Sequence, residues 1–227
     1  MEGLTELGTE VWFRLGDRDL AIGVQRARAL DQGARLTDAQ TAIGAALGVR
    51  ARVLPMSDGP VRTRVLAHER WWPFQEFMIK AGGQGPIEEV DFRGLRAAEA
   101  TPEVLEAIAT ARAIVIGPSN PVVSIGPILA LPGVRDAVGA SPAPVVAVSP
   151  LVRGEVLKGP TAAFMRWSGQ PLSSDGVATT YAGVIDGLVA DEQTDATVVL
   201  QTDLLMDTPA ARQRLAHETL DFALALR

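Results

Sequence analysis

The sequence predicts an α/β fold in which a mostly parallel sheet is combined with a smaller α+β lobe. From about residue 97 onward, apolar runs of strand length alternate with segments of helical patterning. This order is typical of parallel βαβ units. Residues 35–96 instead combine a helix with polar–apolar alternation, which is typical of half-buried antiparallel strands. We therefore assign residues 1–34 and 97–227 to the core and residues 35–96 to an inserted lobe.

The composition limits the classes of function. The chain has 227 residues, of which 47% are hydrophobic, and this is enough for a sizeable core. A net charge of −6 argues against a general nucleic-acid binder but leaves room for a small anionic ligand held by local groups. The chain has no cysteines and only two histidines, which argues against disulfides, thiolate metal sites and multi-histidine sites. With no apolar run of membrane-spanning length and no signal-peptide pattern, we expect a cytoplasmic protein.

The first elements are expected to be two helices with a strand between them. Residues 1–7 are typical of the end of a helix, and residues 10–13 are typical of a strand. A charged turn then leads into a second helix, which Asp17 or Asp19 caps and which runs to about Gln32.

The inserted lobe is expected to begin with a helix and a hairpin. Thr37 as N-cap and Gln40 three residues later form a capping box, which marks the start of a helix. Residues 50–55 are typical of a strand, a tight turn follows, and residues 61–66 alternate polar and apolar side chains. Strand, turn and alternating strand predict a hairpin.

The rest of the lobe is rich in aromatic side chains. Residues 70–80 carry two tryptophans and two phenylalanines, which predicts a short helix or strand that covers one end of a sheet. Residues 81–86 form a glycine-rich loop, and residues 87–92 are typical of a strand.

The core elements alternate between helix and strand. Thr101 as N-cap and Pro102 at the first helical position begin a helix that leads to a strand at residues 113–116. An interrupted helical region follows, and the next strand lies at residues 144–148. Because helices connect these two apolar strands, we predict that they are adjacent and parallel.

Five further elements complete the core. Helices are expected at residues 158–168 and 174–182, and strands at residues 187–191 and 196–201. A last helix begins near residue 208.

The turn after the strand at residues 113–116 is a candidate anion site. Gly117, Pro118, Ser119 and Asn120 follow the strand directly, and Ser124 lies where the next helix is expected to begin. In open α/β sheets ligands bind at the carboxyl ends of strands, where helix N-termini offer free N–H groups. A rigid structural turn is the plainer alternative, and local chemistry alone does not choose between the two.

A second turn has the same design. Ser149 and a proline follow the strand at residues 144–148, and Lys158 precedes a Gly-Pro-Thr helix start. Two neighbouring strands whose tips both carry serine and proline predict one shared cleft. The alternative for Lys158 is a solvated loop charge.

Motifs spread over nearly the whole chain resemble the 2-phospho-L-lactate transferase family, which makes the deazaflavin coenzyme F-420. The motifs are Val-Trp-Phe-Arg-Leu-Gly-Asp-Arg-Asp-Leu-Ala at residues 11–21, Leu-Pro-Met-Ser-Asp at 54–58, Val-Arg-Thr at 61–63, Gly-Pro-Ser-Asn-Pro-Val-Val-Ser-Ile-Gly-Pro-Ile-Leu at 117–129, Val-Ser-Pro at 148–150 and Lys-Gly-Pro at 158–160. They stand in the family's order. A sister group of cell-envelope regulators has a loop closer to Gly-Pro-Gly-Ser-Leu-Tyr, so the Ser-Asn-Pro at residues 119–121 favours the transferase.

The resemblance implies a Rossmann-like three-layer sandwich with an extra lobe. It also implies transfer of a phospholactyl or phosphoenolpyruvyl group from a guanosine diphosphate-linked donor to the deazaflavin precursor Fo. Magnesium assists in that reaction and GMP leaves. We further expect a homodimer.

The chain departs from the family pattern at two places. The family begins with a glycine-rich nucleotide loop and has upstream acidic residues linked to metal binding, and the sequence contains neither. The family commonly has a histidine shortly after Asp-Leu-Ala, where this chain has Ile22 and Gly23.

The first group of site residues carries phosphate chemistry. Attack of a hydroxyl on phosphorus needs positioning and charge neutralisation more than a covalent nucleophile. We expect backbone N–H groups near Ser119 and Asn120 to hold phosphate oxygens, with Ser149 and Lys158 on the same cleft. Ser124 either binds phosphate or caps the next helix. We also expect Asn120→Ala to lower turnover far more than stability.

The second group is expected to hold the flat deazaflavin ring system. Trp12 offers an aromatic platform, and Gly16, Asp17 and Asp19 offer polar groups that fix orientation. The alternative is a core tryptophan followed by two aspartates that cap a helix.

Four further candidates lie in the inserted lobe. Asp58, preceded by Ser57, either joins a metal site or completes an Asx turn. Arg62 and Thr63 either reach a phosphate or form the polar face of a strand. The sequence does not identify the catalytic groups or the metal ligands.

Two function classes stay open at this stage. One is the transferase, and the other is a non-catalytic nucleotide-binding regulator with the same fold. Turnover of Fo with the guanosine diphosphate-linked donor distinguishes them.

Overall fold

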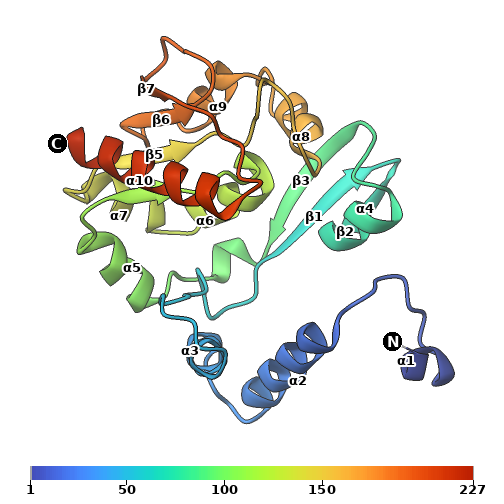
Figure 1. Cartoon of the computed structure of the whole chain (residues 1–227). Helices are drawn as coiled ribbons and strands as arrows, with labels where there is room; N and C mark the ends of the chain where they lie inside the picture. The colour runs from blue at the N-terminus through green and yellow to red at the C-terminus, as the bar shows by residue number, and fades with distance from the viewer. Residues whose placement is uncertain (1, 227) are drawn as a thin grey trace.

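A four-stranded parallel sheet forms the centre of the C-terminal part of the molecule (Figure 1). The computed structural model describes residues 2–226. The strand order is β4-β5-β6-β7, with β4 at Ile114–Ile116, β5 at Val145–Val148, β6 at Gly187–Ala190 and β7 at Val198–Gln201. Ile116 pairs with Ala147, so the predicted parallel pairing of the first two strands is confirmed.

Helices cover both faces of this sheet, which explains why its strands are continuously apolar. One face packs against α5 (Pro102–Ala109), α6 (Gly126–Leu129), α7 (Val134–Ala140), α8 (Thr161–Trp167) and α9 (Ser174–Thr180). The other face packs against α10 (Pro209–Ala225). Ala147 and Leu188 point to the first face, and Val146 and Val189 point to α10. The expected α/β three-layer sandwich is therefore confirmed.

A small antiparallel sheet forms a lobe beside the core. Its order is β2-β1-β3, with β1 at Arg62–Ala67, β2 at Arg70–Pro73 and β3 at Ile87–Arg93. The helix α4 (Phe74–Lys80) covers one face, as the aromatic segment suggested. Buried Val65 and Phe77 pack with Phe164 of α8 and Val123 of the π-helix η2 (Pro121–Ile125), so the lobe and the core share one apolar cluster.

Three N-terminal helices lie outside the two sheets. They are α1 (Glu2–Glu6), α2 (Asp17–Asp31) and α3 (Leu36–Ala46). Figure 1 shows α1 and α2, in blue, away from the parallel sheet, and α2 buries none of its residues. The predicted helices are confirmed here, whereas the division into residues 1–34, 35–96 and 97–227 stays a prediction.

Two predicted strands are wrong. Residues 10–13 and 50–55 lie in no strand, so the expected hairpin between residues 50–55 and 61–66 does not form. Instead, β1 pairs with β2 and β3. His68 and Glu69 join β1 to β2, both with positive φ, as a tight hairpin turn requires. The hairpin was missed because neither residue is the glycine or asparagine that usually marks such a turn.

The helical region after β4 begins earlier than expected, at Pro121 rather than after Ser124. It bends after α6 and continues as α7. Among residues 2–226 no single helix is long and apolar enough to cross a membrane. The segments Pro121–Leu129 and Val134–Ala140 reach the length and apolar composition of a membrane span only when they are taken together, and the chain bends by 81° between them.

Candidate functional site

The carboxyl ends of β4 and β5 bring the two predicted turns together. Because Ile116 and Ala147 are paired in parallel, Gly117 and Ser149 begin neighbouring loops on the same edge of the sheet. Gly117, Pro118 and Ser119 are exposed, whereas Ser149 is buried. At this edge the first turn is therefore exposed to solvent, whereas the serine of the second turn is buried.

Asn120 is a buried helix cap. Its side-chain oxygen accepts hydrogen bonds from the backbone N–H groups of Val122 and Val123, at 2.9 and 3.1 Å. Its amide nitrogen lies 3.4 Å from the hydroxyl of Thr161, at the start of α8. The N–H groups of Val122 and Val123, in the first turn of η2, therefore already have a partner. Asn120 also joins the loop after β4 to the segment that follows Lys158.

The remaining polar groups at this edge differ in availability. The hydroxyl of Ser149 accepts a hydrogen bond from the backbone N–H of Leu151 at 3.2 Å, which closes its turn. Lys158 is exposed and makes no ion pair within the described residues. Ser119 is exposed and Ser124 is half-buried. Ser119, Ser124 and Lys158 are thus at least partly open to solvent, and their role in binding phosphate stays a prediction.

Trp12 lies against the end of α4. The ammonium group of Lys80 is 4.8 Å from the centre of the Trp12 ring, within the range of a cation–π interaction. Lys80 also forms ion pairs with Glu76, at 3.4 Å, and with Glu10, at 3.7 Å. Trp12 is half-buried, so its aromatic surface is neither wholly in the core nor free of partners.

The other three candidates for the deazaflavin site lie at the start of α2. Gly16 is the N-cap, and its backbone N–H donates to the carboxylate of Asp19 at 3.1 Å. Asp17 is exposed in the first turn, where a carboxylate interacts favourably with the helix dipole. Asp19 therefore caps the start of α2, as the alternative interpretation of the sequence expected. Contact of Gly16, Asp17 and Asp19 with Fo stays a prediction.

One segment lies between the Trp12 group and the phosphate turns. The glycine-rich loop after Lys80 packs against Pro160, because a Cβ atom placed on Gly83 would lie 3.3 Å from Cβ of Pro160. Pro160 is two residues from Lys158. The chain that carries Lys80 thus runs from Trp12 to the edge of the Lys158 loop.

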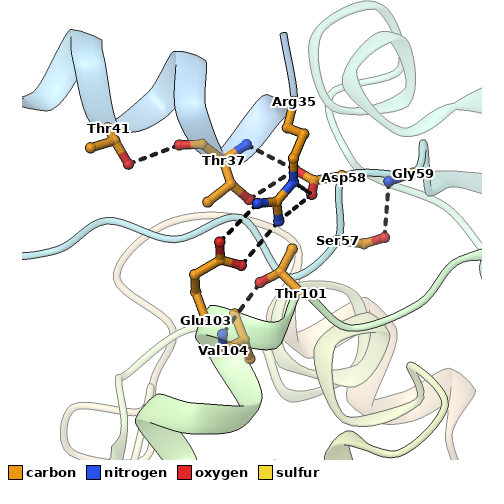
Figure 2. Close-up of polar contacts among 9 residues, drawn as sticks. All are labelled: Arg35, Thr37, Thr41, Ser57, Asp58, Gly59, Thr101, Glu103 and Val104. Atoms are coloured by element: carbon orange, nitrogen blue, oxygen red, sulfur yellow. Dashed lines mark hydrogen bonds and ion pairs between the residues drawn. The ribbon is translucent and has the colours of Figure 1, made fainter.

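Asp58 is the centre of a polar cluster (Figure 2). One carboxylate oxygen accepts hydrogen bonds from the backbone N–H and the hydroxyl of Thr37, both at 2.8 Å. The other accepts from Nε of Arg35 at 2.8 Å. Arg35 also binds Glu103 of α5 through both terminal nitrogens, at 2.8 and 3.0 Å. The cluster ties α3, the turn at residues 57–59 and α5 together.

This cluster corrects two predictions. Thr37 is not the N-cap, because Arg35 occupies that position and the carboxylate of Asp58 satisfies the first-turn N–H group instead. Asp58 completes no Asx turn, because its oxygens bond to Thr37 and Arg35. A carboxylate is a stronger acceptor than the hydroxyl of the predicted capping box.

The cluster shifts the pKa values of its members. Burial alone would raise the pKa of Asp58, but the hydrogen bonds from Thr37 and Arg35 outweigh it and hold that pKa below its usual value. The hydrogen bonds of Arg35 lower the pKa of Glu103. Hydrogen bonds to Glu103 and Asp58 raise the pKa of Arg35, so all three groups stay charged near neutral pH.

The other three candidates of the lobe, Ser57, Arg62 and Thr63, do not lie together on one surface. The hydroxyl of Ser57 accepts from the backbone N–H of Gly59 at 3.0 Å and is buried. Arg62 is exposed, whereas Thr63 is half-buried on the opposite face of β1. Arg62 and Thr63 therefore cannot act on one ligand from the same face.

The described residues do not form a metal site by themselves. Within residues 2–226, no group of three or more His, Asp or Glu side chains is arranged to hold a metal ion. The carboxylates of Asp58 and Glu103 both form ion pairs with Arg35 instead.

Sequence reasoning missed Lys80, Arg35 and Glu103. Arg35 precedes a helix, and Glu103 lies in the first turn of another, so each pattern indicated only a helix start. Lys80 ends an aromatic helix that had no motif of its own. Their partners lie far away in sequence, and no local signal could have identified them.

Comparison with known proteins gives a consistent family. The family model "2-phospho-L-lactate transferase CofD" matches residues 5–219. A 2-phospho-L-lactate transferase of Methanosarcina mazei is 41% identical over 192 residues, which cover 85% of this chain and 63% of the relative. One from Halobacterium salinarum is 40% identical, with 93% and 62% covered. A phosphoenolpyruvate transferase of Kitasatospora aureofaciens is 38% identical, with 90% and 70% covered.

A solved structure supports the fold. The crystal structure of a UPF0052 family protein from Bacillus halodurans superposes with a TM-score of 0.55 at 19% identity, covering 86% of this chain and 56% of that one. The chain spans less than two thirds of the length of the first two transferases named above. The family match nevertheless extends over nearly the whole chain, and the chain belongs to the CofD family, whose model is described as 2-phospho-L-lactate transferase.

Proposed function

We propose that the protein transfers a phospholactyl or phosphoenolpyruvyl group from a guanosine diphosphate-linked donor to Fo, with release of GMP. The observation that carries the proposal is the shared edge at β4 and β5. The loop that begins at Gly117 and the loop that contains Lys158 meet there through Asn120 and Thr161. Membership of the CofD family supports the same class of transfer.

The reaction is a substitution at phosphorus. A hydroxyl oxygen of Fo forms a bond to the phosphorus that carries the lactyl or enolpyruvyl group, and the phosphoanhydride bond to GMP breaks. The hydroxyl loses its proton, and the leaving oxygen keeps the electron pair of the broken bond. Such a transfer depends mainly on alignment and on cations that offset phosphate charge. Lys158 is an exposed cation three residues before Thr161, the hydrogen-bond partner of Asn120.

We place the acceptor beside Trp12. Its ring and the Lys80 ammonium offer an apolar face with an adjacent positive charge. The loop after Lys80 contacts Pro160, so an acceptor there would lie on the side of the lobe that faces the Lys158 loop. Gly16, Asp17 and Asp19 would supply polar contacts at its other end.

Both donor types are compatible with this proposal. Relatives of this chain carry the names 2-phospho-L-lactate transferase and phosphoenolpyruvate transferase. The two donors differ by little more than a double bond, and no described side chain distinguishes them.

We propose that Mg²⁺ binds together with the phosphates of the donor. The described residues do not build a metal cluster, so they fit a magnesium ion poorly by themselves. Mg²⁺ is commonly held by substrate phosphates with one or two carboxylates and several waters. We therefore assign it no ligand from this chain and no step.

We also propose a cytoplasmic homodimer. β4 is an edge strand among the described residues, and its Val115 is 41% exposed. Leu220 and Leu224 of α10 are also exposed apolar side chains. An unpaired sheet edge beside exposed apolar side chains is suited to self-association. Light scattering of the purified protein tests it, and Leu220→Gln should shift the mass toward the monomer.

The placement of the phosphates has its own test. Isothermal titration with GDP should show about tenfold weaker binding for Lys158→Gln, since a lost charge contact of about 1.4 kcal/mol is tenfold in affinity. Arg153→Gln is the matched control, because Arg153 is an exposed cation in the same loop. An equal loss of GDP affinity in both variants would indicate that only the overall positive charge of the loop matters. Unchanged GDP affinity in Lys158→Gln would refute the placement of the phosphates at Lys158.

A further inference from the structure

A cavity of about 540 Å³ lies between the N-terminal helices and the start of β1. Its walls come from α2, α3 and residues 53–62, and they include the apolar side chains of Leu30, Leu36, Val53 and Val61. Ligand sites in proteins typically enclose about 300 to 1,000 Å³ and are mostly apolar with a few polar groups. This cavity has the size and the lining of such a site.

Two arginines line the cavity without a carboxylate partner. Arg26 comes from α2 and Arg62 from the first position of β1. The chain has six more acidic than basic side chains, yet no ion pair to Arg26 or Arg62 occurs within residues 2–226. Nε of Arg26 is buried and has no hydrogen-bond partner there. A buried hydrogen-bond donor without a partner is uncommon in proteins. This atom therefore indicates that a ligand supplies the missing acceptor.

Two other polar side chains of the cavity, those of Asp58 and Ser57, already have partners. The carboxylate of Asp58 bonds to Thr37 and Arg35 and forms no ion pair with Arg26 or Arg62 among the described residues. The hydroxyl of Ser57 accepts from the backbone of Gly59. With Arg26 and Arg62 against the one carboxylate of Asp58, the charged side chains that line the cavity are positive on balance.

A second observation points to an anion at the same place. Arg62 lies directly opposite Arg93 in the antiparallel register of β1 and β3, so both side chains share one face. Like charges directly opposite each other destabilise a sheet. The next pair on that face, Arg64 and Asp91, has opposite charges and forms an ion pair at 2.7 Å. Of this unbalanced pair, Arg62 lines the cavity.

We propose that this cavity binds an organic anion in which a carboxylate or phosphate group is attached to an apolar body. The guanidinium groups of Arg26 and Arg62 bind the anionic group, since planar guanidinium matches such oxygens with paired hydrogen bonds. The apolar walls enclose the body of the ligand. None of the residues at the Ser119, Ser149 and Lys158 edge lines this cavity, so the cavity is separate from the edge where we place the donor phosphates.

Naphthalene compounds that share one body and differ in the head group test the proposal. Isothermal titration is run with 1-naphthyl phosphate, 1-naphthoate and uncharged 1-naphthol at neutral pH. We expect one site for each anion and at least about tenfold weaker binding of the naphthol, which corresponds to about 1.4 kcal/mol. Arg26→Gln and Arg62→Gln should each weaken the two anions about tenfold and leave the naphthol unchanged. Arg62 is exposed, so its replacement preserves the fold.

Three control variants locate the binding. Arg28→Gln removes an exposed arginine from the same helix outside the cavity. Lys158→Gln alters the other proposed phosphate position, and Arg212→Gln alters an apolar groove beside α10. All three should bind the anions like the unchanged protein. The proposal is overturned if the naphthol binds as tightly as the anions, if Arg26→Gln and Arg62→Gln have no effect, or if any control variant loses affinity equally.

Discussion

Asp58 caps α3 by accepting both the backbone N–H and the hydroxyl of Thr37, which lies 21 residues before it, at 2.8 Å. The same carboxylate holds Arg35, which reaches across to Glu103 of α5. A single carboxylate thereby fixes α3 to the turn that precedes β1. These contacts give Asp58 a structural role, and its part in a metal site stays a prediction.

Asp58→Ala should destabilise the protein. Loss of an N-cap acceptor costs about 0.5 to 2 kcal/mol, and the hydrogen bond to Arg35 is lost as well. Urea unfolding should therefore give a decrease of about 1 to 3 kcal/mol in the free energy of unfolding. Asp38→Ala is the control, because Asp38 is exposed in the first turn of the same helix. Equal effects of both variants would contradict the capping role.

Acid should weaken this cluster. The pKa values of Asp58 and Glu103 are lowered from the ordinary values of 3.8 and 4.5. Groups with lowered pKa contribute stability that is complete above the ordinary pKa and is lost as pH falls through the folded pKa. The free energy of unfolding should fall from about pH 5 to about pH 3, and less steeply in Arg35→Met. The same slope in both proteins would show that Arg35 does not cause the shifts.

Asn120→Ala should lower stability as well as turnover. The sequence alone suggested that stability would be spared, but Asn120 is buried and caps η2 through Val122 and Val123. Loss of such a cap costs about 1 kcal/mol, which a thermal melt detects. Asn120→Ser keeps a capping oxygen and should recover most of the stability. A variant with Ala that melts like the unchanged protein would mean that the cap contributes nothing.

Trp12→Ala should weaken Fo more than GDP. Contact with an aromatic face contributes about 0.5 to 1.5 kcal/mol beyond area burial, which is a several-fold change in Kd. Lys80→Met keeps the apolar stem but removes the charge over the ring, and it should weaken Fo by a smaller factor. Fluorescence titration measures both ligands, with Trp71→Ala as control because Arg64 stacks on Trp71 in a similar way. Equal loss of Fo and GDP in Trp12→Ala would indicate local unfolding instead.

The core of the fold was predictable from sequence because its signals are local. The residues of β4 and β5 are continuously apolar, as strands covered on both faces must be. Thr101 and Pro102 form a complete N-terminal signal, and the Thr101 side chain does accept from Val104. These segments carry enough information to identify both the element and its neighbours.

The lobe was less predictable because strand pairing depends on distant partners. Residues 50–55 have the composition of a strand but no partner strand, while β1 pairs with both β2 and β3. The capping box at Thr37 was chemically sound, yet a distant carboxylate displaced it. Nothing near Arg26 or Arg62 in the sequence indicated that they share a cavity.

The candidate site was predicted in part. The two Ser-Pro turns do meet at one edge, because β4 and β5 are adjacent. Sequence reasoning could not tell that Asn120 turns inward while Ser119 stays exposed, since both follow the same strand. It also could not find Lys80, whose contact with Trp12 depends on how α4 packs.

The central claim is transfer from a guanosine diphosphate-linked donor to Fo, and product analysis of that reaction tests it most directly. The purified chain is mixed with Fo, Mg²⁺ and the phospholactate or phosphoenolpyruvate donor, and the products are separated and weighed by mass spectrometry. Our account predicts GMP and the Fo phosphodiester in equal amounts, and no GMP when Fo is omitted. Binding of the nucleotide without any GMP, as expected of a non-catalytic regulator, would contradict it, and so would release of GMP without Fo.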